Sequence, residues 1–211
     1  MSELALPPLS GGHRFPGFRV LDQSPHWDDA TSQIIATLLQ PHGAPRFFTE
    51  QETLTATALF NQLLDQQGAT QIPVTAMVDS RLASGETDGW HYEGMEPDGQ
   101  SWRLTLAWLD ADAHNLQLTT FAAAGSAVQA GILQKVQDLG PNDWHGVPAG
   151  RIWSLWTRYA CTAFYSHPWA WDEIGFPGPA YPRGYKNIGL DRREPFEVAD
   201  AHPTLRDDDA Q

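Results

Sequence analysis

Apolar residues recur at helical spacing along most of the chain, and the clearest case lies between Phe47 and Gly68. The stretch FFTEQETLTATALFNQLLDQQG opens with a T-x-x-E capping box, in which Thr49 and Glu52 each satisfy a backbone N–H of the first turn. Gly68 is the expected C-cap. The apolar stripe of this predicted helix consists of Leu54, Ala58, Leu59, Phe60, Leu63 and Leu64.

Two shorter helices are predicted on either side of it. In SPHWDDATSQIIATLLQ we expect Ser24 as the N-cap and Pro25 at the first helical position, with Asp28 and Asp29 near the positive end of the helix dipole. IPVTAMVDSRLASG predicts a helix with Pro73 near its start. The apolar stripe of the earlier helix is Ile34, Ile35, Leu38 and Leu39.

Three more helices are predicted over residues 101–115, 126–140 and 148–167, separated by glycine-bearing or polar loops such as 84–100. Gly140 follows the second of them, and Pro168 ends the third. Their expected inward faces are Leu104, Ala107, Trp108 and Ala111; then Val128, Ile132, Leu133 and Val136; then Ile152, Trp156, Tyr159, Ala163 and Phe164.

No stretch alternates polar and apolar residues as a strand would, and no repeat of fixed period is present. The pattern therefore predicts a mainly α fold, an irregular bundle of about six helices. Residues 1–22 are expected to be an extended arm, residues 23–198 the helical domain, and residues 199–211 a disordered acidic tail. A long irregular aromatic segment follows Ser166, and it is too rich in Trp, Tyr and Phe to be disordered.

Composition removes several classes of function. The net charge of −13 makes nucleic acid an unfavourable partner. Cys161 is the one cysteine, so no internal disulfide, iron–sulfur cluster or thiolate zinc site is expected, and we expect it to be a small buried side chain. No apolar run is long enough to span a bilayer.

The sequence also lacks the common catalytic motifs: a dinucleotide or phosphate-binding glycine loop, a nucleophile elbow and an H-E-x-x-H pair. His167 with Asp172 and Glu173 is a weak metal candidate, and we favour His167 as a cap on the carbonyl end of the preceding helix. Asp110 and Asp112 lie two residues apart, so we interpret them as solvated helix surface.

The stretch AFYSHPWAWDEIGFPGPAYPRGY, from Ala163 to Tyr185, combines aromatic residues with His, Asp, Glu and Arg. Three interpretations fit this composition equally: a surface for a partner protein, a lid over the chain's own helices, and a shelf for a sugar. The residue types do not distinguish them.

FFTEQETLTATALFNQLL, IPVTAMVDSRL and above all WSLWTRYACTAFYSHPWAWDEIGFPGPAYPRGY resemble the gluconate 2-dehydrogenase subunit 3 family, over residues 47 to about 190. The resemblance implies a small subunit of membrane-associated sugar and polyol dehydrogenases. In these, a glucose–methanol–choline type flavoprotein carries the FAD, and a cytochrome c often completes the complex. The small subunit would have no chemistry of its own and would help the catalytic subunit to fold, mature or be exported.

The resemblance makes the N-terminal arm and the C-terminal segment 164–196 candidates for wrapping the flavoprotein. This chain would itself bind no cofactor or metal. The expected contact residues are Phe164, His167, Trp169, Trp171, Phe176, Tyr181, Arg183, Tyr185, Arg192 and Arg193. The alternative is a stand-alone carbohydrate-binding or hydrolytic protein that uses the aromatic cleft around Trp169–Tyr185.

Small subunits of this family often carry a twin-arginine export signal. The one Arg-Arg pair of this chain, Arg192–Arg193, lies near the other end. We therefore expect a cytoplasmic protein, periplasmic only if the partner carries the export signal.

Overall fold

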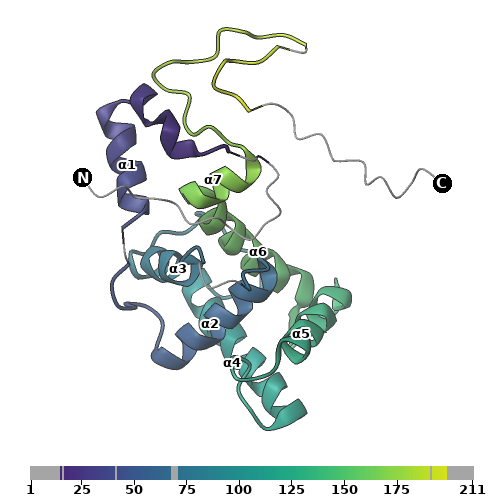
Figure 1. The fold of residues 1–211 in the computed structure, drawn as a ribbon. Coiled ribbons are helices and arrows are strands. Elements are labelled where there is room, and N and C mark those ends of the chain that lie inside the picture. The colour runs from purple at the N-terminus through teal and green to yellow at the C-terminus, as the bar shows by residue number, and fades with distance from the viewer. Residues whose placement is uncertain (1–14, 16, 41, 68–70, 191, 199–211) are drawn as a thin grey trace, which may run out of the picture. The chain divides into compact units, whose positions relative to one another are not determined.

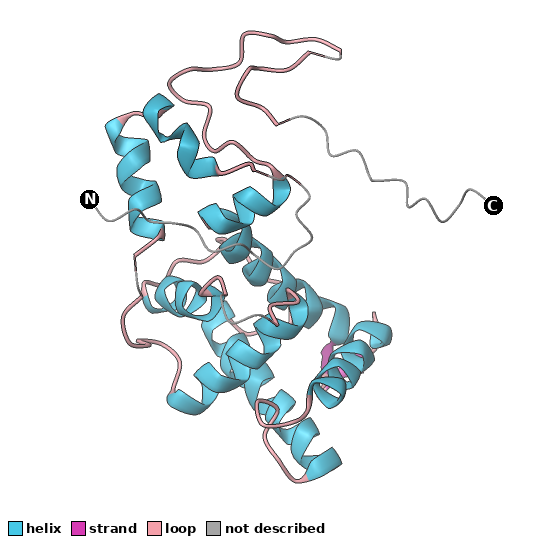
Figure 2. Ribbon diagram, viewed as in Figure 1, coloured by secondary structure: helices cyan, strands magenta, loops and turns pink. Residues whose placement is uncertain are grey.

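The computed structural model describes residues 15, 17–40, 42–67, 71–190 and 192–198 of the 211-residue chain. Most of the predicted N-terminal arm, the expected C-cap Gly68 and the predicted disordered tail lie outside these residues. The described part confirms the predicted mainly α fold (Figures 1 and 2).

The described residues form two compact units. The terminal unit combines the chain up to Gln40 with the chain from Tyr165 onward, and the central unit is Pro41–Phe164. The helices are η1 (a 3-10 helix, Val20–His26), α1 (Asp29–Leu38), α2 (Glu50–Leu63), α3 (Val74–Ala83), α4 (Asp98–Gln117), α5 (Ser126–Leu139), α6 (Ala149–Ser166) and α7 (Pro168–Ile174).

A small hairpin corrects the expectation that the chain has no strand. Strands β1 (Asp143–Trp144) and β2 (Val147–Pro148) pair antiparallel, with Trp144 opposite Val147. The turn between them places His145 and Gly146 at φ angles of 51° and 85°. Positive φ at both central positions is the requirement of a type I′ turn, one of the two common two-residue hairpin turns. Strands of two residues are too short to leave an alternating pattern in the sequence.

The core of the central unit is built around aromatic side chains. Helix α2 packs against α3, α4 and α5, and Trp102 of α4 lies fully buried among the rings of Phe48, Phe60 and Tyr159. The Tyr159 hydroxyl donates a hydrogen bond of 2.6 Å to Asp98. Burial, followed by this bond, raises the pKa of Tyr159. The phenol therefore stays protonated and can act as the donor throughout the physiological range.

The inward face of α4 was predicted wrongly. Leu104, Ala107 and Ala111 are exposed, and Trp108 is half-buried. The other side of α4 faces inward because polar atoms on it have buried partners: Thr105, for example, accepts a hydrogen bond of 3.1 Å from the indole of Trp156. The buried positions of α4 are Asp98, Ser101, Trp102, Thr105, Leu106, Leu109 and Ala113.

On α5, Ile132, Leu133 and Val136 are buried as predicted, and Gly140 caps the helix end. Cys161 is exposed, which corrects its expected burial. It lies away from the stripe of α6 that contains Ile152, Leu155, Trp156, Tyr159, Ala160 and Ala163.

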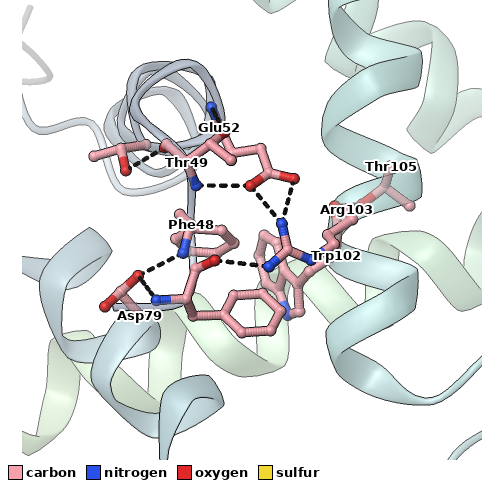
Figure 3. A network of polar contacts seen from close by, with 9 residues as sticks. Phe48, Thr49, Glu52, Asp79, Trp102, Arg103 and Thr105 are labelled. Carbon is pink, nitrogen blue, oxygen red and sulfur yellow. Dashed lines mark hydrogen bonds and ion pairs between the residues drawn. The ribbon is translucent and has the colours of Figure 1, made fainter. Parts of the chain in front are cut away.

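The start of α2 confirms the predicted capping box (Figure 3). The Thr49 hydroxyl accepts from the Glu52 N–H at 3.2 Å, and Glu52 accepts from the Thr49 N–H at 2.8 Å. Arg103 of α4 donates to both carboxylate oxygens of Glu52 and to the Phe47 carbonyl. The network therefore ties the first turn of α2 to α4.

In the terminal unit, the predicted helix from Ser24 is divided in two. Pro25 lies inside η1, and Trp27 is extended, so α1 begins only at Asp29. Asp28, not Ser24, is the N-cap, and it accepts from the Thr31 N–H at 2.8 Å. The formation of η1 also means that the predicted extended arm ends before Val20.

Candidate functional site

The candidate site is the C-terminal segment from Phe164 to Phe196, and its first part is more regular than predicted. Helix α7 begins after His167, with Pro168 at its first position, and ends at Gly175, whose φ is 67°. Proline fits the first helical position because no N–H is needed there, and glycine adopts the left-handed cap without strain. The sequence HPWAWDEIG contains both signals, Pro168 and Gly175, but we interpreted it as irregular because of its aromatic composition.

His167 has a different role from the predicted cap on the preceding helix. Its Nδ1 accepts a hydrogen bond of 3.2 Å from the Trp169 N–H, so it is the N-cap of α7. The side chain is buried, with 2% of its surface exposed. An accepting ring nitrogen carries no proton, so this geometry belongs to the neutral imidazole.

Trp171 lies in the interior of the terminal unit. It forms a cluster with Val20 and Ile35, and only 8% of its surface is exposed. Its indole N–H donates to the Tyr165 carbonyl at 2.7 Å, and its ring meets that of Phe176 edge-on. For this side chain the structure supports the lid interpretation. Trp169 packs against the same cluster and is half-buried.

Asp172 connects α7 to η1. Its Oδ1 accepts from the Val20 N–H at 2.6 Å. Burial raises the pKa of this carboxyl, although the bond from Val20 acts in the opposite direction. Within the described ranges no three His, Cys, Asp or Glu side chains gather closely enough to hold a metal ion.

Three predicted contact residues present exposed rings to solvent. Phe176, Tyr181 and Tyr185 are 37%, 68% and 50% exposed. They lie in or next to the loop that follows α7 (Figure 2). Phe164 is half-buried near the end of the central unit's range, and Arg192 and Arg193 are exposed.

Arg183 is partly internal to the segment. Its guanidinium lies 3.6 Å from the centre of the Phe196 ring and donates to Gln23 and to the Pro177 carbonyl. Tyr185 also contacts the Phe196 ring, with centroids 5.8 Å apart. Arg183 and Tyr185 are therefore both held against the Phe196 ring.

Glu194 is a residue that the sequence interpretation missed. It is 6% exposed and accepts hydrogen bonds from the backbone N–H groups of Lys186 and Asn187 and from the Asn187 side chain. Its own N–H donates to Glu197 at 2.6 Å. Its main partners are backbone N–H groups, so the sequence held no signal for this role.

Two cavities of about 430 Å³ each lie in the central unit. The Asp79 and Asp112 carboxylates that line them already accept hydrogen bonds from other residues of this unit. One is lined by residues from α2, α3 and the loops beside them, including Asp79, which accepts from three backbone N–H groups. The other lies between α4 and α5 and includes Asp112. The carboxylate of Asp112 accepts from the Trp144 indole and contacts His145, each at 2.9 Å.

Asp112 and Asp110 are thus not the solvated surface that we predicted. Asp110 accepts from the Thr55 hydroxyl at 3.0 Å and from the Phe121 N–H at 2.9 Å. Both carboxylates join separate parts of the central unit. These bonds give them a structural role.

No helix in the described part of the chain is both long and apolar enough to cross a membrane.

A comparison with protein-family models matches residues 37–178 to the family described as gluconate 2-dehydrogenase subunit 3. The match covers more than half of the 211 residues and includes α2 to α7. Searches of the curated proteins and of the solved structures gave no match. The family match confirms the resemblance seen in the sequence, and the chain belongs to the gluconate 2-dehydrogenase subunit 3 family.

Proposed function

We propose that this chain is a non-catalytic subunit that binds and stabilises the catalytic subunit of an FAD-dependent sugar or polyol dehydrogenase. The family is named for a subunit of a dehydrogenase, which supports association with a catalytic partner. The partner, a flavoprotein of the glucose–methanol–choline type, would hold the FAD and supply the hydride transfer. We propose a cytoplasmic complex, periplasmic only if the partner carries the export signal.

The exposed rings of Phe176, Tyr181 and Tyr185 are the observation that carries the binding role. Large exposed aromatic side chains beside arginine are typical of interface hot spots. The chain's polar pairs are consistent with a structural role, because Asp79, Asp110 and Asp112 each accept bonds that hold its own helices together. Binding only the folded catalytic subunit would raise that subunit's stability by mass action.

The test begins with the neighbouring genes: we expect one of them to encode a large FAD-dependent oxidoreductase, which is then co-expressed with this chain. We expect a tagged chain to co-purify with a yellow protein that oxidises a sugar or polyol, whereas the chain alone is colourless and inactive. Tyr181→Ala should weaken the complex. Leu54→Ala should not, because Leu54 is 53% exposed on α2 and not part of an inward stripe as predicted. A chain that stays monomeric beside the flavoprotein and binds a glycan tightly would instead favour the carbohydrate-binding alternative.

A further inference from the structure

The loop between Tyr185 and Glu194 presents two apolar side chains to solvent. Ile188 is 82% exposed and Leu190 is 92% exposed, the two highest values among the large hydrophobic residues that the structure describes. Single exposed apolar residues are common on protein surfaces. Here two of them lie in one loop with only Gly189 between them, so one partner surface can contact both.

The loop is supported by an organised base. The buried carboxylate of Glu194 accepts from the Lys186 and Asn187 N–H groups and fixes the chain just before Ile188. Hydrogen bonds to a carboxylate are stronger than those between neutral groups. A loop that is already ordered loses less conformational entropy when it binds.

Basic residues lie near these two side chains in a chain that is otherwise acidic. Lys186, Arg192 and Arg193 flank them against one acidic residue of the same stretch of sequence, Asp191, whereas the net charge of the chain is −13. None of these three cations forms an ion pair with any residue that the structure describes. Local positive charge of this kind attracts an acidic partner surface and accelerates association.

We propose that residues 186–190 together with Arg192 and Arg193 are a docking loop, and that Ile188 and Leu190 enter an apolar hollow rimmed by carboxylates on the dehydrogenase catalytic subunit. The inference rests on the proposed function, because it assumes that the catalytic subunit is the partner. Glu194 is a positioning residue: it holds the loop without touching the partner. The family match ends at residue 178, so this loop adds an interaction surface outside the matched region.

The experiment measures binding of the purified full-length chain to the purified catalytic subunit by biolayer interferometry. We expect the double change Ile188→Asp with Leu190→Asp to weaken binding roughly 30-fold or more, as for interface hot spots. The matched control is Leu118→Asp, at an 80%-exposed loop residue of the central unit with φ of 55°, where aspartate is well tolerated. This control should bind like the wild type.

Two further variants test the charge and the loop base. Arg192→Glu with Arg193→Glu should weaken binding and flatten its dependence on salt. Glu194→Ala, which removes the acceptor of both amides, should weaken binding through loss of loop order, seen as faster hydrogen exchange at the Lys186 and Asn187 amides. Because Ile188, Leu190, Arg192 and Arg193 are exposed, circular dichroism and melting temperature should be unchanged in their variants.

Wild-type binding of the Ile188/Leu190 variant would overturn the docking loop while leaving the proposed function intact. Failure of the wild-type chain to bind the catalytic subunit at all would instead overturn the proposed function. Two other occupants are tested directly. Light scattering tests self-association, and sedimentation with anionic phosphatidylglycerol vesicles tests membrane binding. If the Ile188→Asp/Leu190→Asp variant loses either property but still binds the catalytic subunit like the wild type, the proposal is overturned.

Discussion

At the scale of single residues, Asp79 shows how a buried carboxylate organises the central unit. It is 3% exposed and accepts from the backbone N–H groups of Arg46, Phe47 and Phe48 at 2.7, 3.0 and 2.8 Å. Figure 3 shows it beside the segment that leads into α2. These three N–H groups precede a helix and have no partner inside it. The bond from Phe48 is buried and the other two are partly buried, so without the carboxylate the Phe48 N–H would be buried unpaired.

We therefore expect Asp79→Ala to lower the free energy of unfolding by about 3 kcal/mol, because it leaves one buried and two partly buried donors without an acceptor. Asp79→Asn, which keeps one acceptor oxygen, should cost less. The control Asp143→Ala removes an exposed carboxylate and should change stability by less than about 0.5 kcal/mol. Urea denaturation measures all three; equal stability of Asp79→Ala and Asp143→Ala would contradict this role.

Asp172 gives a prediction about pH. Burial raises its pKa above the ordinary value of 3.8, so the folded state binds this proton more tightly than the unfolded state. Its contribution to the free energy of unfolding is therefore most favourable at low pH and is lost as pH rises through the folded-state pKa. Asp172→Asn removes the titration while its Oδ1 can still accept from Val20.

The melting temperature of Asp172→Asn, relative to that of the wild type, should accordingly increase between pH 3.5 and pH 7. Asp28→Asn is the control of opposite sign, because the hydrogen bonds from Thr31 lower the pKa of Asp28. The stability that the Asp28 carboxylate provides is present above pH 3.8 and is lost as pH falls through its folded-state pKa. The melting temperature of Asp28→Asn, relative to that of the wild type, should therefore decrease between pH 3.5 and pH 7. Parallel pH profiles for the two variants would refute this assignment.

At the scale of elements, the start of α2 was predicted correctly because its local signal is complete, whereas the start predicted at Ser24, which has no capping box, was wrong. The T-x-x-E box of α2 is complete within four residues, so it needs no tertiary information. The inward face of α4 was predicted wrongly because a second set of its residues also recurs at helical spacing. Contacts from α6, such as Trp156 with Thr105, are what decide between the two faces, and they are not local in sequence.

The same limit applies to the candidate site. Trp171 and Tyr181 were both predicted as partner contacts, and both are aromatic residues in one Pro/Gly-rich segment. Only the packing of Val20 and Ile35 separates them: it buries Trp171, whereas Tyr181 stays 68% exposed. Glu194 escaped prediction because its partners, Lys186 and Asn187, are backbone N–H groups that any sequence supplies.

This difference revises the expectation for Trp171. Trp171→Ala should destabilise the terminal unit by about 3 kcal/mol, since it leaves a large cavity in a buried cluster. Trp171→Phe should restore part of that stability, and Tyr181→Ala should leave it unchanged. Hydrogen exchange of the α7 amides measures the effect. Unchanged α7 protection in Trp171→Ala, together with a weaker complex, would show instead that Trp171 is a partner contact.

At the scale of the whole molecule, the chain combines a helical central unit with a terminal unit that presents exposed aromatic and apolar side chains. Composition predicted an acidic protein without common catalytic motifs, and the family match agrees with a subunit of a dehydrogenase. The division into two units could not be predicted, because the terminal unit joins segments more than a hundred residues apart, as in the bond from Val20 to Asp172.

The most direct test of the central claim is sedimentation velocity of the chain mixed with the FAD-dependent catalytic subunit, recorded at 280 nm and at the flavin wavelength. We expect the flavin boundary to move faster when this chain is added, and the complex to resist heating better than the catalytic subunit alone. A flavin boundary that sediments identically with and without the chain would contradict the account.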